Sequence, residues 1–83
     1  MIKVLVVEDS PVAREFLIHL LNSAPGIQVV GAVDDGREAL EAAREKHPDL
    51  ITMDIHMPEM DGFATTRRIM ENHPVPIVIV SGS

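Results

Sequence analysis

The sequence predicts an α/β domain built on a doubly wound parallel sheet, with four strands in the order 2-1-3-4. Short apolar runs alternate with amphipathic segments in a βαβαβαβ pattern, which is typical of parallel strands joined by helical crossovers. Polar side chains follow three of the four apolar runs, and they can meet only if the first and third strands are neighbours. With 83 residues, the chain is long enough for one small domain and too short for two.

The strands are predicted at four short apolar segments. Residues 4–7 read Val-Leu-Val-Val, a continuous run typical of a strand buried on both faces. Residues 27–33 are rich in β-branched side chains, which favour strands. Residues 50–53 lead directly to Asp54, and residues 77–80 read Ile-Val-Ile-Val.

The helices are predicted from their start signals and from apolar spacing. Ser10 before Pro11 indicates a helix start, because Ser caps free N–H groups and Pro suits the first helical position. Asp35, followed three residues later by Glu38, resembles a capping box, and Pro48 ends that helix. Three stripes with helical spacing follow from the sequence: Val12, Phe16, Leu17, Leu20 and Leu21; Ala39, Leu40 and Ala43; and Phe63, Thr66, Ile69 and Met70.

The composition excludes several classes of function. The chain has no Cys, which removes disulfides, thiolate metal sites and Cys nucleophiles and fits a reducing cytoplasm. The net charge of −6 weighs against nucleic-acid binding, because phosphate backbones attract basic surfaces. No run approaches the ~18 apolar residues that a membrane span requires. We therefore expect a cytoplasmic protein without nucleic-acid or membrane partners.

Acidic and hydroxyl side chains mark the predicted site. Glu8 and Asp9 follow the first strand, Asp54 follows the third, and Ser81 follows the fourth. In open parallel sheets, ligands bind at this edge where the strand order reverses. Carboxylates packed together repel one another, and their oxygens suit Mg²⁺. A carboxylate beside such an ion can attack a phosphoryl group to form an aspartyl phosphate, and Ser81 can donate a hydrogen bond to it.

A simpler alternative is that strand-end polar residues only cap the helices that follow, as Asp9 or Ser10 would cap the first helix. His56 lies two residues after the acid that ends the third strand. It is more simply a solvent-facing loop residue than a side-chain metal ligand. The remaining histidines share no spacing, and we expect them at the surface: His19, His47 and His73.

Three segments resemble the motifs of receiver domains from two-component response regulators. They are residues 4–10 (Val-Leu-Val-Val-Glu-Asp-Ser), residues 54–62 (Asp-Ile-His-Met-Pro-Glu-Met-Asp-Gly) and residues 76–82 (Pro-Ile-Val-Ile-Val-Ser-Gly). They occur in the order and at the spacing of that family, and the second is the most specific. The resemblance spans the whole chain and implies a flavodoxin-like fold. Among receivers, the chain is most similar to the regulatory domain of chemotaxis protein-glutamate methylesterases.

The resemblance implies a role for each site residue. Asp54 would be the phospho-acceptor, Asp9 would bind Mg²⁺ directly, and Glu8 would bind it through water. The backbone carbonyl of His56 would complete the protein ligands, and Ser81 would be the switch hydroxyl. The phosphoryl group would come from a sensor histidine kinase or a small phosphodonor. The implied function is Mg²⁺-dependent phosphorylation that switches an output in chemotaxis, in a domain that is not itself an enzyme.

The chain also departs from the family pattern. A complete receiver has five strands and five helices, whereas this sequence supplies four and three. We therefore expect residues 1–83 to be the N-terminal portion of a receiver, without the fifth strand, the last two helices or an output domain. The family's Lys after the fifth strand and the aromatic switch residue on that strand have no counterpart here. The resemblance therefore does not extend to normal phosphorylation or to the activation movement.

Three other functions stay open at this point. The chain could be an excised or engineered receiver fragment that lacks activity and forms homo-oligomers, through the open edge at residues 77–80 or through a half-bare sheet face. A phosphohydrolase that uses an aspartyl phosphate would need a second acid at position 56, which is His56. A flavin or nucleotide site would need a Gly- or hydroxyl-rich loop, whereas residues 8–11 read Glu-Asp-Ser-Pro.

Overall fold

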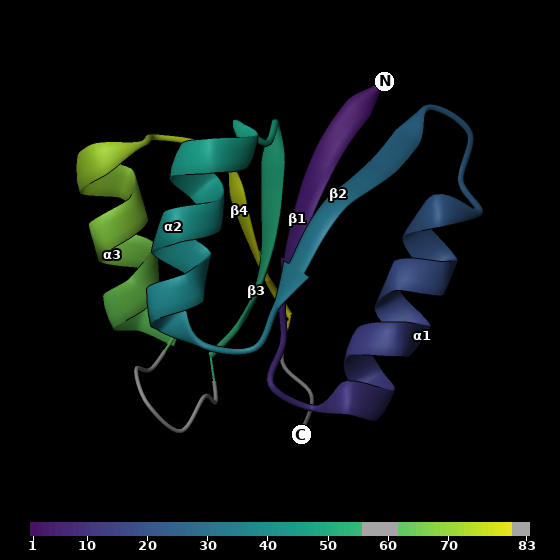
Figure 1. Cartoon of the computed structure of the whole chain (residues 1–83), viewed down its shortest axis with the longest axis horizontal. Coiled ribbons are helices and arrows are strands. Elements are labelled where there is room, and N and C mark those ends of the chain that lie inside the picture. Colours follow the sequence, from purple (N-terminus) through teal and green to yellow (C-terminus); the bar gives the residue numbers. More distant parts are fainter. Residues whose placement is uncertain (56–61, 81–83) are drawn as a thin grey trace.

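The computed structural model describes residues 1–55 and 62–80 and confirms the predicted βαβαβαβ order (Figure 1). The elements are β1 (Ile2–Val7), α1 (Pro11–Asn22), β2 (Ile27–Val33), α2 (Gly36–Lys46), β3 (Leu50–Asp54), α3 (Gly62–Asn72) and β4 (Ile77–Val80). Each helix begins and ends close to its predicted signals, since Ser10 and Asp35 occupy the N-cap positions of α1 and α2. Within the described ranges, no helix is long and apolar enough to cross a membrane.

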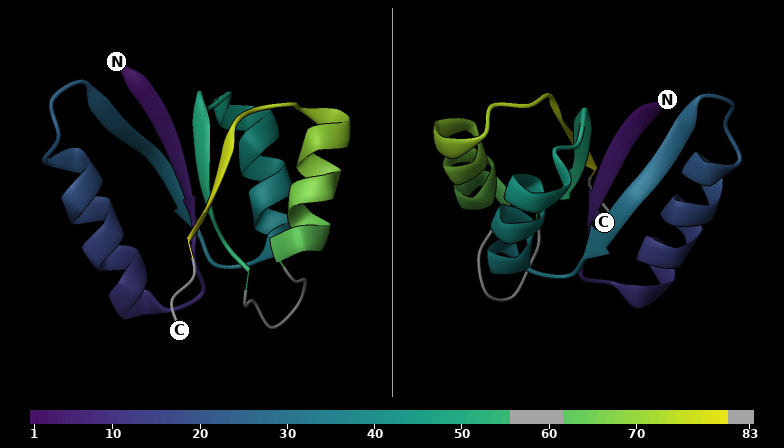
Figure 2. Two further views of the ribbon diagram at one scale, coloured as in Figure 1. Left: turned by 180° about the vertical axis from the view of Figure 1, so that it is seen from behind. Right: turned by 45° about the horizontal axis from the view of Figure 1, so that its top comes forward.

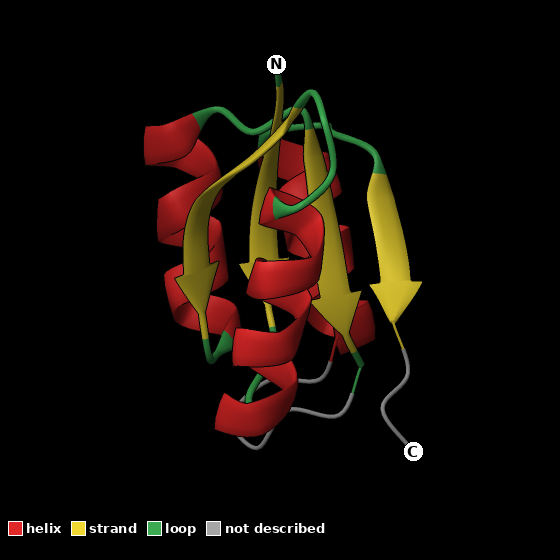
Figure 3. Ribbon diagram, turned by 90° about the vertical axis from the view of Figure 1, so that its right-hand side faces the viewer, coloured by secondary structure: helices red, strands yellow, loops and turns green. Residues whose placement is uncertain are grey.

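The four strands form one parallel sheet in the order β2-β1-β3-β4, as predicted. All four arrowheads point towards the same end of the molecule (Figure 3). Because β1 and β3 are neighbours, Val7 at the end of β1 pairs with Met53. The residues that follow these two strands therefore emerge side by side at the carboxyl edge of the sheet.

The helices cover the two faces of the sheet unequally. α1 lies alone on one face, and α2 and α3 lie together on the other (Figure 1 and Figure 2). Right-handed crossovers require this arrangement when the first connection runs outward from β1 and the next two run in the opposite direction. The fold is thus the doubly wound α/β architecture that the sequence predicts.

The main hydrophobic core lies between the sheet and the pair α2 and α3. It is aliphatic, as the low aromatic content predicts, and small side chains on α2 allow the helix to approach the sheet closely. Its buried residues are Leu5, Val7, Ala39, Ala42, Ala43, Ile51, Met53 and Ile69.

The face covered by α1 is packed less completely. α1 contacts β2 and β1, and the β1 side chains that face it, Val4 and Val6, are buried. None of the residues of α1 is itself buried. Val12, Phe16 and Leu20 are 81%, 67% and 54% exposed, so much of the predicted apolar stripe of this helix faces solvent.

The predicted apolar stripe of α3 was wrong at two positions. Phe63 and Met70 are 66% and 46% exposed, and the buried residues of the helix are Gly62, Thr65 and Ile69. The reason is that the first turn of α3 packs closely against the chain after β3 at Gly62. This close approach turns the helix so that positions three and seven residues later face the sheet.

Candidate functional site

The carboxyl edge of the sheet brings three acidic side chains together. Glu8 and Asp9 follow β1, and Asp54 ends β3. Each offers one carboxylate oxygen, and these oxygens all lie within 4.8 Å of one another. Three of the residues singled out in the sequence therefore form one cluster at the point where the strand order reverses.

Two members of the cluster are nearly inaccessible to solvent. Glu8 is 5% exposed and Asp54 is 4% exposed, whereas Asp9 is half-buried. The backbone N–H of Ser10 donates to Oε2 of Glu8 at 3.2 Å. The guanidinium of Arg14 donates to the backbone carbonyl of Glu8 at 3.1 Å. The start of α1 thus holds both the backbone and the side chain of Glu8.

Helix capping does not account for the two acids after β1. The N-cap of α1 is Ser10, whose side chain accepts from the N–H of Ala13 at 3.4 Å. Neither Glu8 nor Asp9 is therefore the N-cap of this helix. This geometry favours a binding role for the cluster over the simpler structural alternative.

The acids of the cluster resist ionisation. Burial raises the pKa of Glu8 above its ordinary value of 4.5, and the neighbouring carboxyl of Asp54 raises it further, against the lowering effect of the Ser10 N–H. Partial burial and the carboxyl of Asp54 also raise the pKa of Asp9 above 3.8. Since removing charged groups from water disfavours their ionised forms, a bound cation would stabilise this cluster.

The cluster fits a divalent cation that prefers oxygen ligands. Mg²⁺ binds oxygens at about 2.0–2.1 Å in an octahedron, so opposite ligand oxygens lie about 4.2 Å apart. Carboxylate oxygens within 4.8 Å of one another can surround one such ion after small adjustments. The donors of this group are all anionic oxygens, which suit Mg²⁺ better than soft metals.

Gly62 sets the backbone immediately after Asp54. A Cβ atom at this position would lie 2.4 Å from Cα of Ile55 and 2.6 Å from the carbonyl oxygen of Asp54. The N–H of Gly62 also donates to the carbonyl of Ile55 at 3.1 Å. In the sequence, Gly62 stands out only as the last residue of the motif at residues 54–62. The signal that could have indicated its structural role is the presence of Gly beside a predicted helix, where Gly is a poor helix former.

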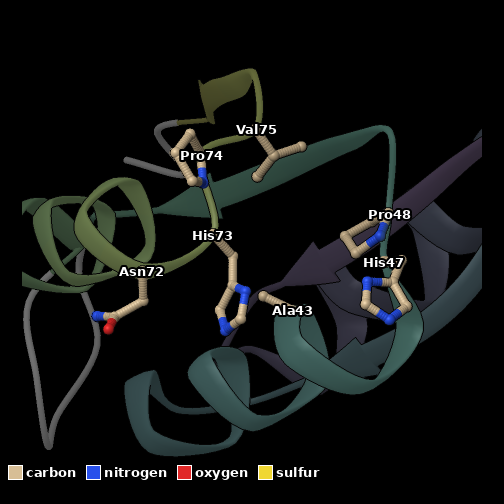
Figure 4. Close-up of a pocket in the computed structure, with 7 residues that line it drawn as sticks. All are labelled: Ala43, His47, Pro48, Asn72, His73, Pro74 and Val75. Carbon is tan, nitrogen blue, oxygen red and sulfur yellow. The ribbon is translucent and has the colours of Figure 1, made fainter.

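The other two predicted site residues, His56 and Ser81, lie outside the described residues. Among the remaining histidines, His19 and His47 are exposed, as predicted, and His73 is half-buried. His47 and His73 line a cavity of about 310 Å³ between the ends of α2 and α3 (Figure 4). This cavity lies at the amino edge of the sheet, opposite the acid cluster.

A second acidic group occurs where α2 begins. Asp34, Asp35 and Glu38 also bring carboxylate oxygens within 4.8 Å of one another. Here one acid has a structural role, because the side chain of Asp35 accepts from the N–H of Glu38 at 2.8 Å. Asp34 and Glu38 are exposed, and exposed acids of this kind are common without a bound ion.

Comparison with known proteins identifies the family. Residues 4–83 match the response regulator receiver domain. The chain belongs to this family. The receiver is 63% identical over all its 83 residues to a protein-glutamate methylesterase/protein-glutamine glutaminase from Nitrosospira multiformis. It is 61% identical over the same length to a protein of the same description from Syntrophus aciditrophicus. The predicted similarity to chemotaxis methylesterases is confirmed.

Solved structures agree with this assignment. The response regulator domain of Thermotoga maritima CheB matches 98% of the receiver with a TM-score of 0.95 and 44% identity. A chain from the CheX–CheY–BeF3–Mg²⁺ complex of Borrelia burgdorferi matches 99% with a TM-score of 0.90 and 29% identity. The receiver spans 60% and 63% of these two chains. It spans only 23% and 24% of the two methylesterase relatives.

Proposed function

We propose that this receiver accepts a phosphoryl group on Asp54 in a Mg²⁺-dependent step that switches the output of a chemotaxis signalling protein. The observation that carries the proposal is the position of Asp54. Its carboxylate is buried at the carboxyl edge of the sheet, within 4.8 Å of the carboxylate oxygens of Glu8 and Asp9. Membership of the receiver family supplies the class of reaction.

We assign the cation ligands residue by residue. Asp9 would bind Mg²⁺ directly, Glu8 through water, and Asp54 through one carboxylate oxygen, with the backbone carbonyl of His56 completing the protein ligands. The bound ion would neutralise charge on the incoming phosphoryl group. A solved structure similar to this receiver contains Mg²⁺ in its complex, which supports the same cation here.

The side chains have distinct parts in the transfer. A carboxylate oxygen of Asp54 attacks the phosphorus of the donor, forming a new O–P bond. The bond from phosphorus to the leaving group breaks, and that group departs with the electron pair. Ser81 then donates a hydrogen bond to a phosphoryl oxygen, and this movement is the proposed switch. The 4% exposure of Asp54 limits the access of water to the acyl phosphate.

The partners follow from the family and from the length of the relatives. A sensor histidine kinase is the proposed donor in the cell, which we take to be the cytoplasm. We assign the methylesterase activity in the relatives' names to the part of those proteins that this chain does not match. Residues 1–83 are proposed to be the N-terminal portion of the receiver and no enzyme in their own right. We propose no nucleic-acid partner for a chain of net charge −6.

Intact-mass measurement tests the proposal. The chain is incubated with acetyl phosphate and Mg²⁺, alongside Asp54→Asn and, as a matched control, Asp34→Asn from the second acidic group. We expect one added phosphoryl group in the native chain and in Asp34→Asn, none in Asp54→Asn, and none when EDTA replaces Mg²⁺. No addition to a chain shown to be folded would refute the proposal and favour the inactive-fragment alternative.

A further inference from the structure

The turn between β1 and α1 carries two of the three acids of the cluster. Figure 1 shows the chain passing directly from the end of β1 into this helix. Hydrogen bonds between Glu8, Ser10 and Arg14 close a ring across the turn. The backbone N–H of Ser10 donates to Oε2 of Glu8 at 3.2 Å, and the backbone N–H of Arg14 donates to the carbonyl of Ser10 at 2.8 Å. The guanidinium of Arg14 donates back to the carbonyl of Glu8 at 3.1 Å.

The bond from Arg14 acts on the peptide unit that joins Glu8 to Asp9. A peptide unit is planar, so the direction of the Glu8 carbonyl also fixes the position of the nitrogen and Cα of Asp9. On the other side of Glu8, its backbone N–H donates to the carbonyl of Val33 at 3.0 Å. The guanidinium of Arg14 therefore determines the place from which the side chain of Asp9 starts.

That starting place matters because the cluster must form against the repulsion of its own charges. The carboxylate oxygens of Glu8, Asp9 and Asp54 lie within 4.8 Å of one another. Ionised carboxylates at such distances repel, and a turn that was free to move would let Asp9 swing away from Asp54. The ring of hydrogen bonds opposes this movement before any cation is bound.

Stability of the helix does not account for the position of Arg14. A cation near the N-terminal end of a helix opposes the helix dipole, and Arg14 lies near the start of α1. Its side chain is half-buried and donates to a neutral carbonyl oxygen. A charged donor makes such a bond stronger than a neutral donor would, which suits a contact that holds the backbone.

We propose that Arg14 is a positioning residue of the cation site, which holds the Glu8–Asp9 peptide so that the carboxylate of Asp9 faces Asp54. The inference rests on the proposed function, because it concerns the same Mg²⁺ site. Arg14 does not bind the cation and acts only through the peptide. Contacts that orient metal ligands in this way typically contribute about 10–100-fold to metal affinity.

The charge of Arg14 and its positioning role predict opposite effects when the guanidinium is removed. A positive charge beside a cation site repels the cation, so removal of that charge alone would strengthen Mg²⁺ binding. Removal of the hydrogen bond would free the peptide of Glu8 and Asp9 and weaken Mg²⁺ binding. The direction of the change in affinity therefore separates the two roles.

Mg²⁺ titrations followed by the amide chemical shifts in NMR spectra test the proposal. The native chain is compared with Arg14→Met, which keeps an apolar stem without a donor, and with Arg37→Met as the matched control. Arg37 is exposed on the first turn of α2 at the same edge of the sheet. We expect Arg37→Met to bind Mg²⁺ about as tightly as the native chain and Arg14→Met to bind it about tenfold or more weakly.

Arg14→Lys adds a rescue, because it keeps both the charge and an N–H donor, and it should bind Mg²⁺ more tightly than Arg14→Met. The same spectra show whether each variant is folded, and Arg14→Gln replaces Arg14→Met if the latter does not fold.

Three results would overturn the positioning role while the proposed function stands. They are a native chain that binds Mg²⁺ with no loss of affinity in Arg14→Met, an equal loss in Arg37→Met, and an Arg14→Lys protein that binds no more tightly than Arg14→Met. A folded native chain that binds no Mg²⁺ would overturn the proposed cation site and this inference together.

Discussion

At the scale of single residues, Glu8 is a buried acid whose ionisation is disfavoured by its surroundings. It is 5% exposed to solvent and lies beside two other carboxyl groups. Burial first, and Asp54 second, raise its pKa above 4.5. A carboxyl whose pKa is raised by folding favours the folded state below its unfolded pKa. That contribution is lost as the pH rises through the folded pKa.

Glu8→Gln should therefore stabilise the metal-free protein at pH 7. The amide removes the buried charge but keeps an oxygen to accept from the N–H of Ser10. The difference from the native chain should shrink as the pH falls through the raised pKa of the folded Glu8 carboxyl, and it should be smallest below the ordinary value of 4.5. Urea unfolding in EDTA at several pH values measures this, with Glu45→Gln on the exposed side of α2 as control.

Mg²⁺ should make the native chain more stable than Glu8→Gln, the reverse of the order expected in EDTA. A cation that binds only the folded state adds stability by mass action, and the native chain has one more carboxylate to bind it than Glu8→Gln. In the same urea unfolding experiment, adding Mg²⁺ should therefore raise the free energy of unfolding more for the native chain than for Glu8→Gln. A Glu8→Gln protein that is less stable than the native chain in EDTA at pH 7 would contradict this account of the cluster.

Gly62 supports the site through its lack of a side chain. Ala normally stabilises a helix relative to Gly by about 1 kcal/mol. Here the new Cβ would lie 2.4 Å from Cα of Ile55, and relieving that contact would move the backbone next to Asp54. Gly62→Ala should lower the free energy of unfolding by about 1–3 kcal/mol, as measured in urea. A variant as stable as the native chain would show that α3 does not pack in this way.

At the scale of elements, Asp35 stabilises the start of α2, whereas the neighbouring Asp34 does not cap the helix. The side chain of Asp35 caps the helix by accepting from the N–H of Glu38 at 2.8 Å. Asp34 instead raises the pKa of Glu38 through a side-chain hydrogen bond and its charge. Asp35→Ala should cost about 1 kcal/mol of unfolding free energy, and Asp34→Ala should cost less. Equal losses in urea unfolding would argue against Asp35 as the cap.

The helices also differ in how much they contribute to the core. Ile69 on α3 is fully buried, so Ile69→Ala should cost about 2–5 kcal/mol. Phe16 on α1 is 67% exposed, so Phe16→Ala should cost less than about 1 kcal/mol despite its larger side chain. Paired urea titrations test the difference. A larger loss of unfolding free energy for Phe16→Ala than for Ile69→Ala would mean that Phe16 on α1 is packed in solution and not exposed.

At the scale of the whole molecule, most of the fold could be predicted from local patterns. The strand at residues 77–80 and the caps Ser10 and Asp35 are encoded in short segments of sequence. The strand order followed from one non-local requirement, the convergence of Asp54 with the acids after β1. The face that α3 buries could not be predicted, because it depends on how closely Gly62 approaches another part of the backbone. The poor burial of α1 depends likewise on what packs against it.

The meeting of the three acids at the candidate site could be predicted, whereas the contacts that hold them in place could not. Its acids follow strands whose ends must meet at one sheet edge, so their meeting could be deduced from topology. The contacts that hold Glu8 in place, from the N–H of Ser10 and the guanidinium of Arg14, depend on local geometry at the start of α1. No residue spacing indicates them.

The central claim is that Asp54 is the phospho-acceptor, and chemical localisation of the phosphoryl group tests it most directly. The chain is treated with acetyl phosphate and Mg²⁺, then with borohydride, which reduces an aspartyl phosphate to homoserine, and is mapped by peptide mass spectrometry. We predict conversion at Asp54 alone. Conversion at another acid such as Asp61, or none in a folded and Mg²⁺-treated sample, would contradict the account.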